Sequence, residues 1–160
     1  MSRARVGLAA ALLAAAACGP PRSSFELVLT HEGGRTERVG SGADVRGAVD
    51  NAGFLALDDP SWGLAMSLGG LASGEHMVSS KAGSLALVRK GSGDVWTTDL
   101  GGSCTVWLNP HASSNGSVVG GWFYCKALTS NSGEKVDVGS GVFKTLINDA
   151  ANNPRLDPPI

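Results

Sequence analysis

The sequence predicts an all-β fold with one small antiparallel domain, either sandwich-like or barrel-like. Its apolar segments are short, and clusters of Gly, Ser, Asn and Asp separate them at intervals typical of strands and turns. Several of these segments alternate apolar and polar residues, which is the period of a half-buried strand. Glycine supplies 23 of the 160 residues without a three-residue period, so neither collagen nor wholesale disorder fits. The length suits a single domain.

Residues 1–17 differ from the rest of the chain and predict a signal peptide. Arg3 and Arg5 precede an uninterrupted apolar run from Val6 to Ala17. This run is shorter than the roughly 20 residues that a helix needs to cross a bilayer, so a cleaved secretory leader explains it better than a membrane helix. The chain is therefore expected to be exported.

The residues around the end of the leader form a second recognisable pattern. Ala15, Ala16 and Ala17 precede Cys18, and a Gly-Pro-Pro-Arg-Ser-Ser segment follows it. This pattern resembles the lipobox of bacterial lipoproteins. The resemblance implies a diacylglyceryl group on the sulfur of Cys18, cleavage before this residue, acyl chains such as palmitate, and a tether over residues 18–24. It also implies that the membrane is a partner through the lipid, at the outward side of the cell membrane or outer membrane.

One position departs from the usual lipobox. The family usually carries Leu, Val or Ile three residues before the cysteine, where this chain has Ala15. Ala15 and Ala17 equally suit an ordinary secretory cleavage, which would leave Cys18 as a free thiol. The resemblance covers the leader alone and carries no information about the mature domain.

The folded domain is predicted to span residues 25–151, followed by an extended, proline-containing tail over residues 152–160. In the first segment Phe25, Leu27 and Leu29 share one face of a strand, and Glu32-Gly33-Gly34 then favours a hairpin. Nine strands are predicted in all: Phe25–Thr30, Arg35–Val39, Phe54–Leu57, Gly63–Leu68, Ser84–Arg89, Val95–Leu100, Cys104–Asn109, Val118–Leu128 and Lys135–Phe143.

Two further segments carry helical signals. Ser41, three residues before Asp44, resembles an N-cap, and Gly53 could end a helix that begins there. Phe143, Leu146, Ile147 and Ala150 fit the i, i+3, i+4, i+7 spacing of one helix face. Short helices are therefore expected over residues 41–53 and 143–150.

The stretch from Ser103 to Leu128 predicts two paired antiparallel strands. If partner numbers sum to 229, Cys104 faces Cys125 and Trp107 faces Trp122 on the opposite side of the sheet. A two-residue turn at Asn115-Gly116 would instead shift the pairs by two residues. Direct bonding of the cysteines favours the first register. Once Cys18 serves as the lipid acceptor, an even number of cysteines remains for a disulfide.

Trp107, Trp122 and Tyr124 share the other face of these strands. Large aromatic side chains usually build cores, so this face is expected to pack beneath a second sheet or a helix. The alternative is an exposed aromatic surface that stacks sugar rings or another apolar ligand. Exposure of both indoles on one continuous surface would favour this alternative.

The remaining motifs do not support catalysis, metal binding or a cofactor. Ser132 to Lys135 matches S-x-x-K, but the surrounding residues predict a hairpin turn. His31, His76 and His111 have no partners at metal-ligand spacing and are expected in solvated loops. A formal charge of -1 provides no basic surface for nucleic acid.

Together these features predict a non-catalytic envelope lipoprotein with a binding, display or structural role. The partner would be a glycan or an envelope protein, neither of which the sequence identifies. The alternatives are a small glycan-binding module that uses Trp107, Trp122 and Tyr124, and, less favoured, an envelope hydrolase.

Overall fold

A computed structural model describes residues 23–40 and 45–148, and all of the regular structure in these ranges is β-strand. The predicted leader, Cys18 and the proline-containing tail lie outside the described residues. The strands are β1 (Ser24–His31), β2 (Thr36–Val39), β3 (Arg46–Val49), β4 (Phe54–Asp58), β5 (Trp62–Ser67), β6 (Gly74–Ser79), β7 (Ser84–Arg89), β8 (Asp94–Thr97), β9 (Ser103–Leu108), β10 (Val118–Ser130) and β11 (Lys135–Leu146).

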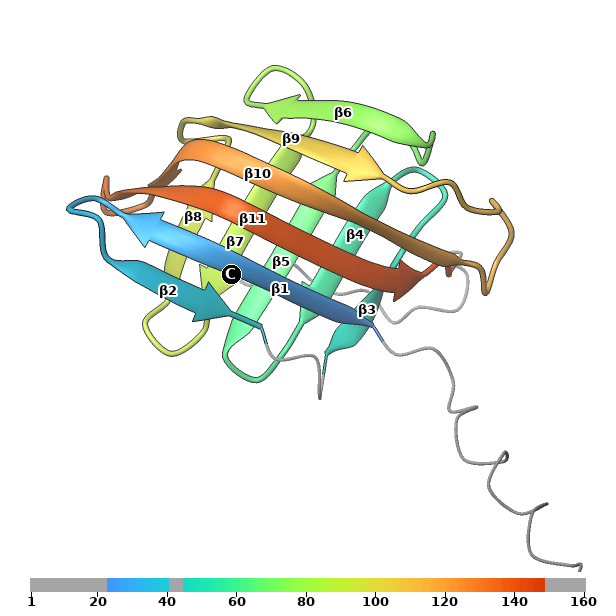
Figure 1. The fold of residues 1–160 in the computed structure, drawn as a ribbon, viewed down its shortest axis with the longest axis horizontal. Coiled ribbons are helices and arrows are strands. Elements are labelled where there is room, and N and C mark those ends of the chain that lie inside the picture. The colour runs from blue at the N-terminus through green and yellow to red at the C-terminus, as the bar shows by residue number, and fades with distance from the viewer. Residues whose placement is uncertain (1–22, 41–44, 149–160) are drawn as a thin grey trace, which may run out of the picture.

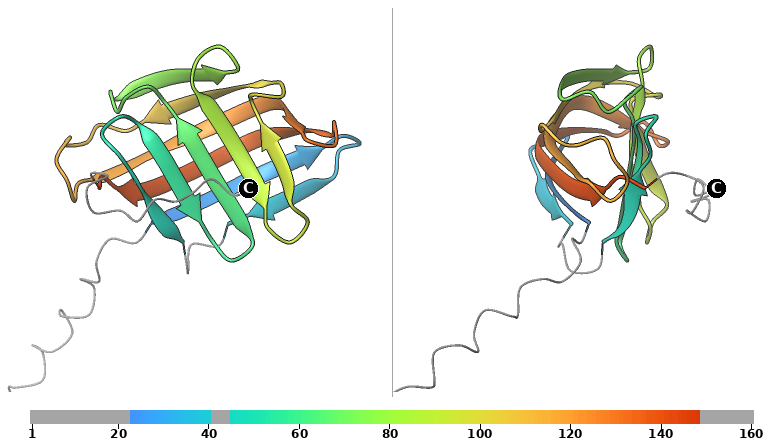
Figure 2. Two further views of the ribbon diagram at one scale, coloured as in Figure 1. Left: turned by 180° about the vertical axis from the view of Figure 1, so that it is seen from behind. Right: turned by 90° about the vertical axis from the view of Figure 1, so that its right-hand side faces the viewer.

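The strands form one curled antiparallel sheet, whose main path runs β2-β1-β11-β10-β8-β7-β5-β4-β3. The sheet bends into two facing walls (Figures 1 and 2). The front wall contains β1, β2, β6, β9, β10 and β11, and the back wall contains β3, β4, β5, β7 and β8. Strand β10 is shared, because its first part pairs with β9 while Thr129 and Ser130 pair with β8.

The two walls also meet where the end of β11 reaches the edge strand β3. Ile147, just after β11, forms a bridge with Val49 of β3, and the amide of Asn148 donates a hydrogen bond to the carbonyl of Val49. The sheet is therefore a partly closed, barrel-like structure. The prediction of a small all-β, barrel-like domain is confirmed.

The core fills the space between the walls. Alternate residues of each strand point inward, as the two-residue period requires. Leu27 and Leu29 of β1 and Leu55 of β4 are almost wholly buried, as are Phe123 of β10 and Trp96 of β8. One continuous set of apolar side chains thus joins the two walls, and outward-facing residues remain available for contacts with other molecules.

The helix predicted over residues 41–53 is wrong in its described part. Residues 46–49 form β3, which pairs with β4 from Arg46 opposite Asp58 to Val49 opposite Leu55. Gly47 has a φ of 139°, which a helix cannot contain, and a Cβ at this position would lie 2.0 Å from the carbonyl oxygen of Ala56. Glycine therefore allows the close strand approach that defines this edge.

The second predicted helix, over residues 143–150, is also wrong in its described part. Phe143 to Leu146 complete β11. Thr145 is buried, and its hydroxyl donates a hydrogen bond to the Gly47 carbonyl oxygen and shares another with the Ser23 hydroxyl. A polar residue thus occupies an inward position, which hides the strand alternation and leaves an apolar pattern with helical spacing.

The sequence also missed one strand, β6. This strand pairs with β9 alone and lies at the edge of the front wall, where Val78 is its one buried residue. With so little apolar burial, the segment lacks the alternating pattern that marks the other strands.

Candidate functional site

Trp107, Trp122 and Tyr124 form a continuous aromatic patch on the outer face of the front wall. Their exposed fractions are 39%, 43% and 42%. The expectation that this face packs beneath another layer is therefore wrong. The core lies on the inner side of the same strands, and the exposed fractions show that no described segment covers the outer side.

Strand register explains why the three rings lie together. Trp107 of β9 is directly opposite Trp122 of β10, while Cys104 is opposite Cys125 on the inner face. The predicted register, with partner numbers summing to 229, is confirmed. Tyr124 follows Trp122 by two residues and so projects from the same face.

The three rings share nearly one orientation. The planes of Trp107 and Trp122 differ by 7°, with ring centroids 6.2 Å apart. The planes of Trp122 and Tyr124 differ by 15°, with centroids 6.1 Å apart. These separations lie within the range of favourable aromatic contacts, so each ring holds its neighbour in place. The patch is therefore ordered before any ligand arrives.

Apolar residues extend the aromatic patch sideways. Val142 of β11 lies directly opposite Trp122 and is 48% exposed. Met77 of β6 is also exposed, and its sulfur accepts a hydrogen bond from the Thr105 hydroxyl, so it covers the sheet beside Tyr124. The apolar surface thus crosses four strands, from β6 to β11.

A shallow hollow of about 460 Å³ adjoins Trp122. It exists because Gly120, which faces outward beside Trp122, carries no side chain. Gly121 faces inward, where a Cβ would lie 2.1 Å from the carbonyl oxygen of Trp107, whereas Gly120 leaves an outward gap. The rim of the hollow consists of Asn109, Pro110, Val118, Trp122, Val142, Phe143 and Lys144.

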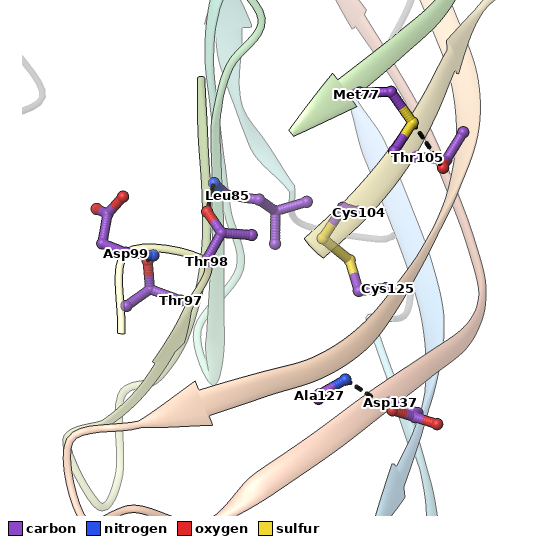
Figure 3. Close-up of a disulfide and its surroundings, with 10 residues drawn as sticks. All are labelled: Met77, Leu85, Thr97, Thr98, Asp99, Cys104, Thr105, Cys125, Ala127 and Asp137. Atoms are coloured by element: carbon purple, nitrogen blue, oxygen red, sulfur yellow. Dashed lines mark hydrogen bonds between the residues drawn. A yellow bond between two sulfur atoms is a disulfide. The ribbon is translucent and has the colours of Figure 1, made fainter. Parts of the chain in front are cut away.

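A cysteine pair holds β9 and β10 together beneath this surface (Figure 3). The sulfurs of Cys104 and Cys125 are 2.06 Å apart, at disulfide distance, and both residues are buried. Because the pair joins the strand that carries Trp107 to the strand that carries Trp122, it fixes the register on which the aromatic patch depends.

A β-bulge lies farther along β10, where the strand bends from the front wall toward the back. Ala127 has a positive φ of 54°, and its amide donates a hydrogen bond to Asp137 of β11 (Figure 3). The ammonium group of Lys126 donates to the other oxygen of the same carboxylate. These two hydrogen bonds lower the pKa of Asp137, that from Lys126 contributing most.

His31 is not the solvated loop residue that the sequence predicts. It ends β1, is 5% exposed, and its Nδ1 and Nε2 lie 2.7 Å from Glu134 and 3.2 Å from Glu37. Glu37 also pairs with Arg89, whose guanidinium lies over the buried Trp96 ring. Both ring nitrogens of His31 are thus occupied by carboxylates, which suits a structural cluster at the end of the barrel better than proton transfer to a ligand.

The other positions considered from sequence show no site chemistry. His76 lies in β6, rather than in the predicted loop, and contacts the Ala72 carbonyl oxygen, while His111 contacts that of Asn109. Ser132 lies in the predicted turn between β10 and β11. Within the described ranges, no group of three or more His, Cys, Asp or Glu side chains could hold a metal ion. Nor does any helix there have the length and hydrophobicity needed to cross a bilayer.

Comparison with known proteins found no matching family model, no matching curated protein and no matching solved structure.

Proposed function

We propose that this chain is an exported, lipid-anchored protein of the cell envelope that binds a glycan, without catalysis, through its aromatic patch. The observation that supports the glycan most directly is the exposure of Trp107, Trp122 and Tyr124 as one ordered surface. Water-exposed apolar patches of this kind mark interaction sites. The proposed anchor is the acylated Cys18.

The chemistry of the patch suits sugar rings. A pyranose ring presents an apolar face of C–H bonds, which packs against the electron-rich face of an indole or phenol. Its hydroxyl groups can remain hydrated at the same time, because the patch lies on an open wall of the barrel. Two indoles and a phenol of similar orientation offer such contacts to successive rings of an oligosaccharide.

The proposed anchor would keep this surface near the membrane. Ser24 follows Cys18 by six positions, and a fully extended segment of this length spans at most about 20 Å. Ser24 pairs with Lys144 of β11, which in turn pairs with Gly120 of β10 beside the patch. The chain would thus enter the domain two strands away from the proposed binding surface, which favours glycans that lie close to the membrane.

A glycan array tests the binding role. Wild-type protein should bind one class of glycan, and Trp122→Ala should lose this binding while it remains folded, because Trp122 lies on the outer face and outside the core. Phe54→Ala is the matched control, since Phe54 is an exposed aromatic residue on the back wall, and it should bind as the wild type does. Equal binding by wild type and Trp122→Ala, or no binding by either, would refute the proposal.

Membrane fractionation and intact mass test the anchor. Wild-type protein should be found with the membranes, with a mature mass that begins at Cys18 and includes acyl chains. Two or more chains are expected, because one acyl chain gives only marginal binding. Cys18→Ser should be soluble and unacylated. A wild-type product that is soluble and carries no added mass would contradict lipidation.

A further inference from the structure

The hollow beside Trp122 differs from the aromatic patch in its polar groups. On the outer face, register places Lys144 of β11 directly across from Gly120 of β10. On the other side of Gly120 lies Asn109, whose backbone N–H donates a hydrogen bond to the Gly120 carbonyl oxygen and which also lines the hollow. The gap left by Gly120 is therefore bordered by an ammonium group and by a carboxamide side chain, next to an exposed indole.

The charge of this hollow is one-sided. Lys144 is the one ionisable residue on its rim, and none of the described residues that line it is acidic. No carboxylate in the described part of the chain lies within ion-pair distance of Lys144. Lys90 and Lys126, in contrast, are paired with Asp58 and Asp137. Among residues 23–40 and 45–148, the hollow thus retains a cation without an ion-pair partner.

We propose that this hollow is a subsite for a sugar residue that carries a carboxylate. The sugar ring packs on Trp122, its carboxylate lies in the gap above Gly120, and Lys144 pairs with it. Asn109 supplies an amide that can donate a hydrogen bond to a ring hydroxyl or to the carboxylate. This inference rests on the proposed glycan-binding function and names the class of glycan.

A carboxylated sugar fits this surface better than an anionic membrane does. Without Arg3 and Arg5, the mature chain has 11 basic residues against 14 acidic ones, so its overall charge does not attract an anionic bilayer. The positive charge is instead local, at one side of an apolar ring surface. That arrangement matches a ligand which combines an apolar ring face with a single negative group.

The test uses isothermal titration calorimetry to compare the binding of two ligands, a cello-oligosaccharide and its C6-oxidised counterpart. The second ligand carries carboxylates in place of the C6 hydroxymethyl groups. Wild-type protein should bind the oxidised form about threefold to fivefold more tightly, the range expected of an exposed ion pair, and added salt should reduce this preference. Lys144→Gln should bind both forms equally. Lys135→Gln, an exposed lysine on the same strand but away from the hollow, should keep the preference.

The possible results separate this inference from the function on which it rests. Equal binding of the two oligosaccharides by wild type, with loss of both in Trp122→Ala, would overturn the carboxylate subsite and leave glycan binding intact. A preference that persists in Lys144→Gln would also overturn the subsite. If neither sugar binds, while vesicles of phosphatidylglycerol and phosphatidylcholine capture unacylated Cys18→Ser protein through Trp122, the surface is a membrane contact and both proposals fail.

Discussion

Reduction of the Cys104–Cys125 pair should lower the stability of the domain by about 3 kcal/mol. The two residues are 21 positions apart, and closing a loop of this length removes about that much conformational entropy from the unfolded chain. For a domain whose total stability is about 5 to 15 kcal/mol, the loss is large. It corresponds to a fall of about 10 to 15 °C in the melting temperature of a domain of this size.

The measurement is thermal unfolding, followed by circular dichroism, of the same protein before and after reduction. Cys18→Ser is the suitable background, because the reductant then acts on one pair of sulfurs. A Cys104→Ala, Cys125→Ala double variant is the control and should melt at one temperature with or without reductant. If the oxidised and reduced proteins melt at the same temperature, the pair does not constrain the unfolded chain and the reasoning is wrong.

Two further predictions concern β11. The pKa of Asp137 is lowered in the folded state, so its carboxylate stabilises the fold above about pH 3.8, and this stabilisation is lost as the pH falls through the folded-state pKa. The free energy of unfolding in urea should therefore differ between wild type and Asp137→Asn at about pH 6, and this difference should shrink toward about pH 3. A difference that does not change with pH would exclude this role. Gly141→Ala should destabilise the fold by about 1 to 3 kcal/mol, because a Cβ at this position would lie 2.4 Å from the Phe123 ring. Adding Phe123→Leu to the same chain should recover part of this loss, as measured by denaturant unfolding. Additive losses in the double variant would contradict this contact.

The strands that sequence could predict are those in which inward and outward residues alternate. Cys104 and Cys125 fixed the register of β9 and β10 further, since only one pairing brings them together. Prediction failed where a buried position is polar or an edge strand is barely buried. Near the end of β11, Thr145 is buried and its hydroxyl is hydrogen-bonded inside the fold, while β6 buries only Val78. Neither segment therefore alternates apolar and polar residues as a half-buried strand is expected to do.

The candidate site was predictable in part. Alternation shows that Trp107, Trp122 and Tyr124 share one face, but it cannot show whether another layer covers that face. That answer depends on how the whole sheet curls, which involves strands far away in the sequence. The hollow at Gly120 could not be predicted either. A glycine in a strand indicates a missing side chain, but the residues that border the gap, here Lys144, are known only once the strand pairing is known.

The position of β1 between β2 and β11 affects how a newly made chain behaves. Strand β1 is the first of the described strands to emerge from the ribosome, and most of its pairing is with β11, residues 135–146, which is the last of them to be synthesised. Until that segment arrives, β1 has only the four residues of β2 beside it, too little pairing to hold a strand in water. Until residues 135–146 are made, the front wall therefore lacks the strand that joins β1 to β10, and under the proposed export β1 stays unpaired on that side while the chain approaches the translocation channel.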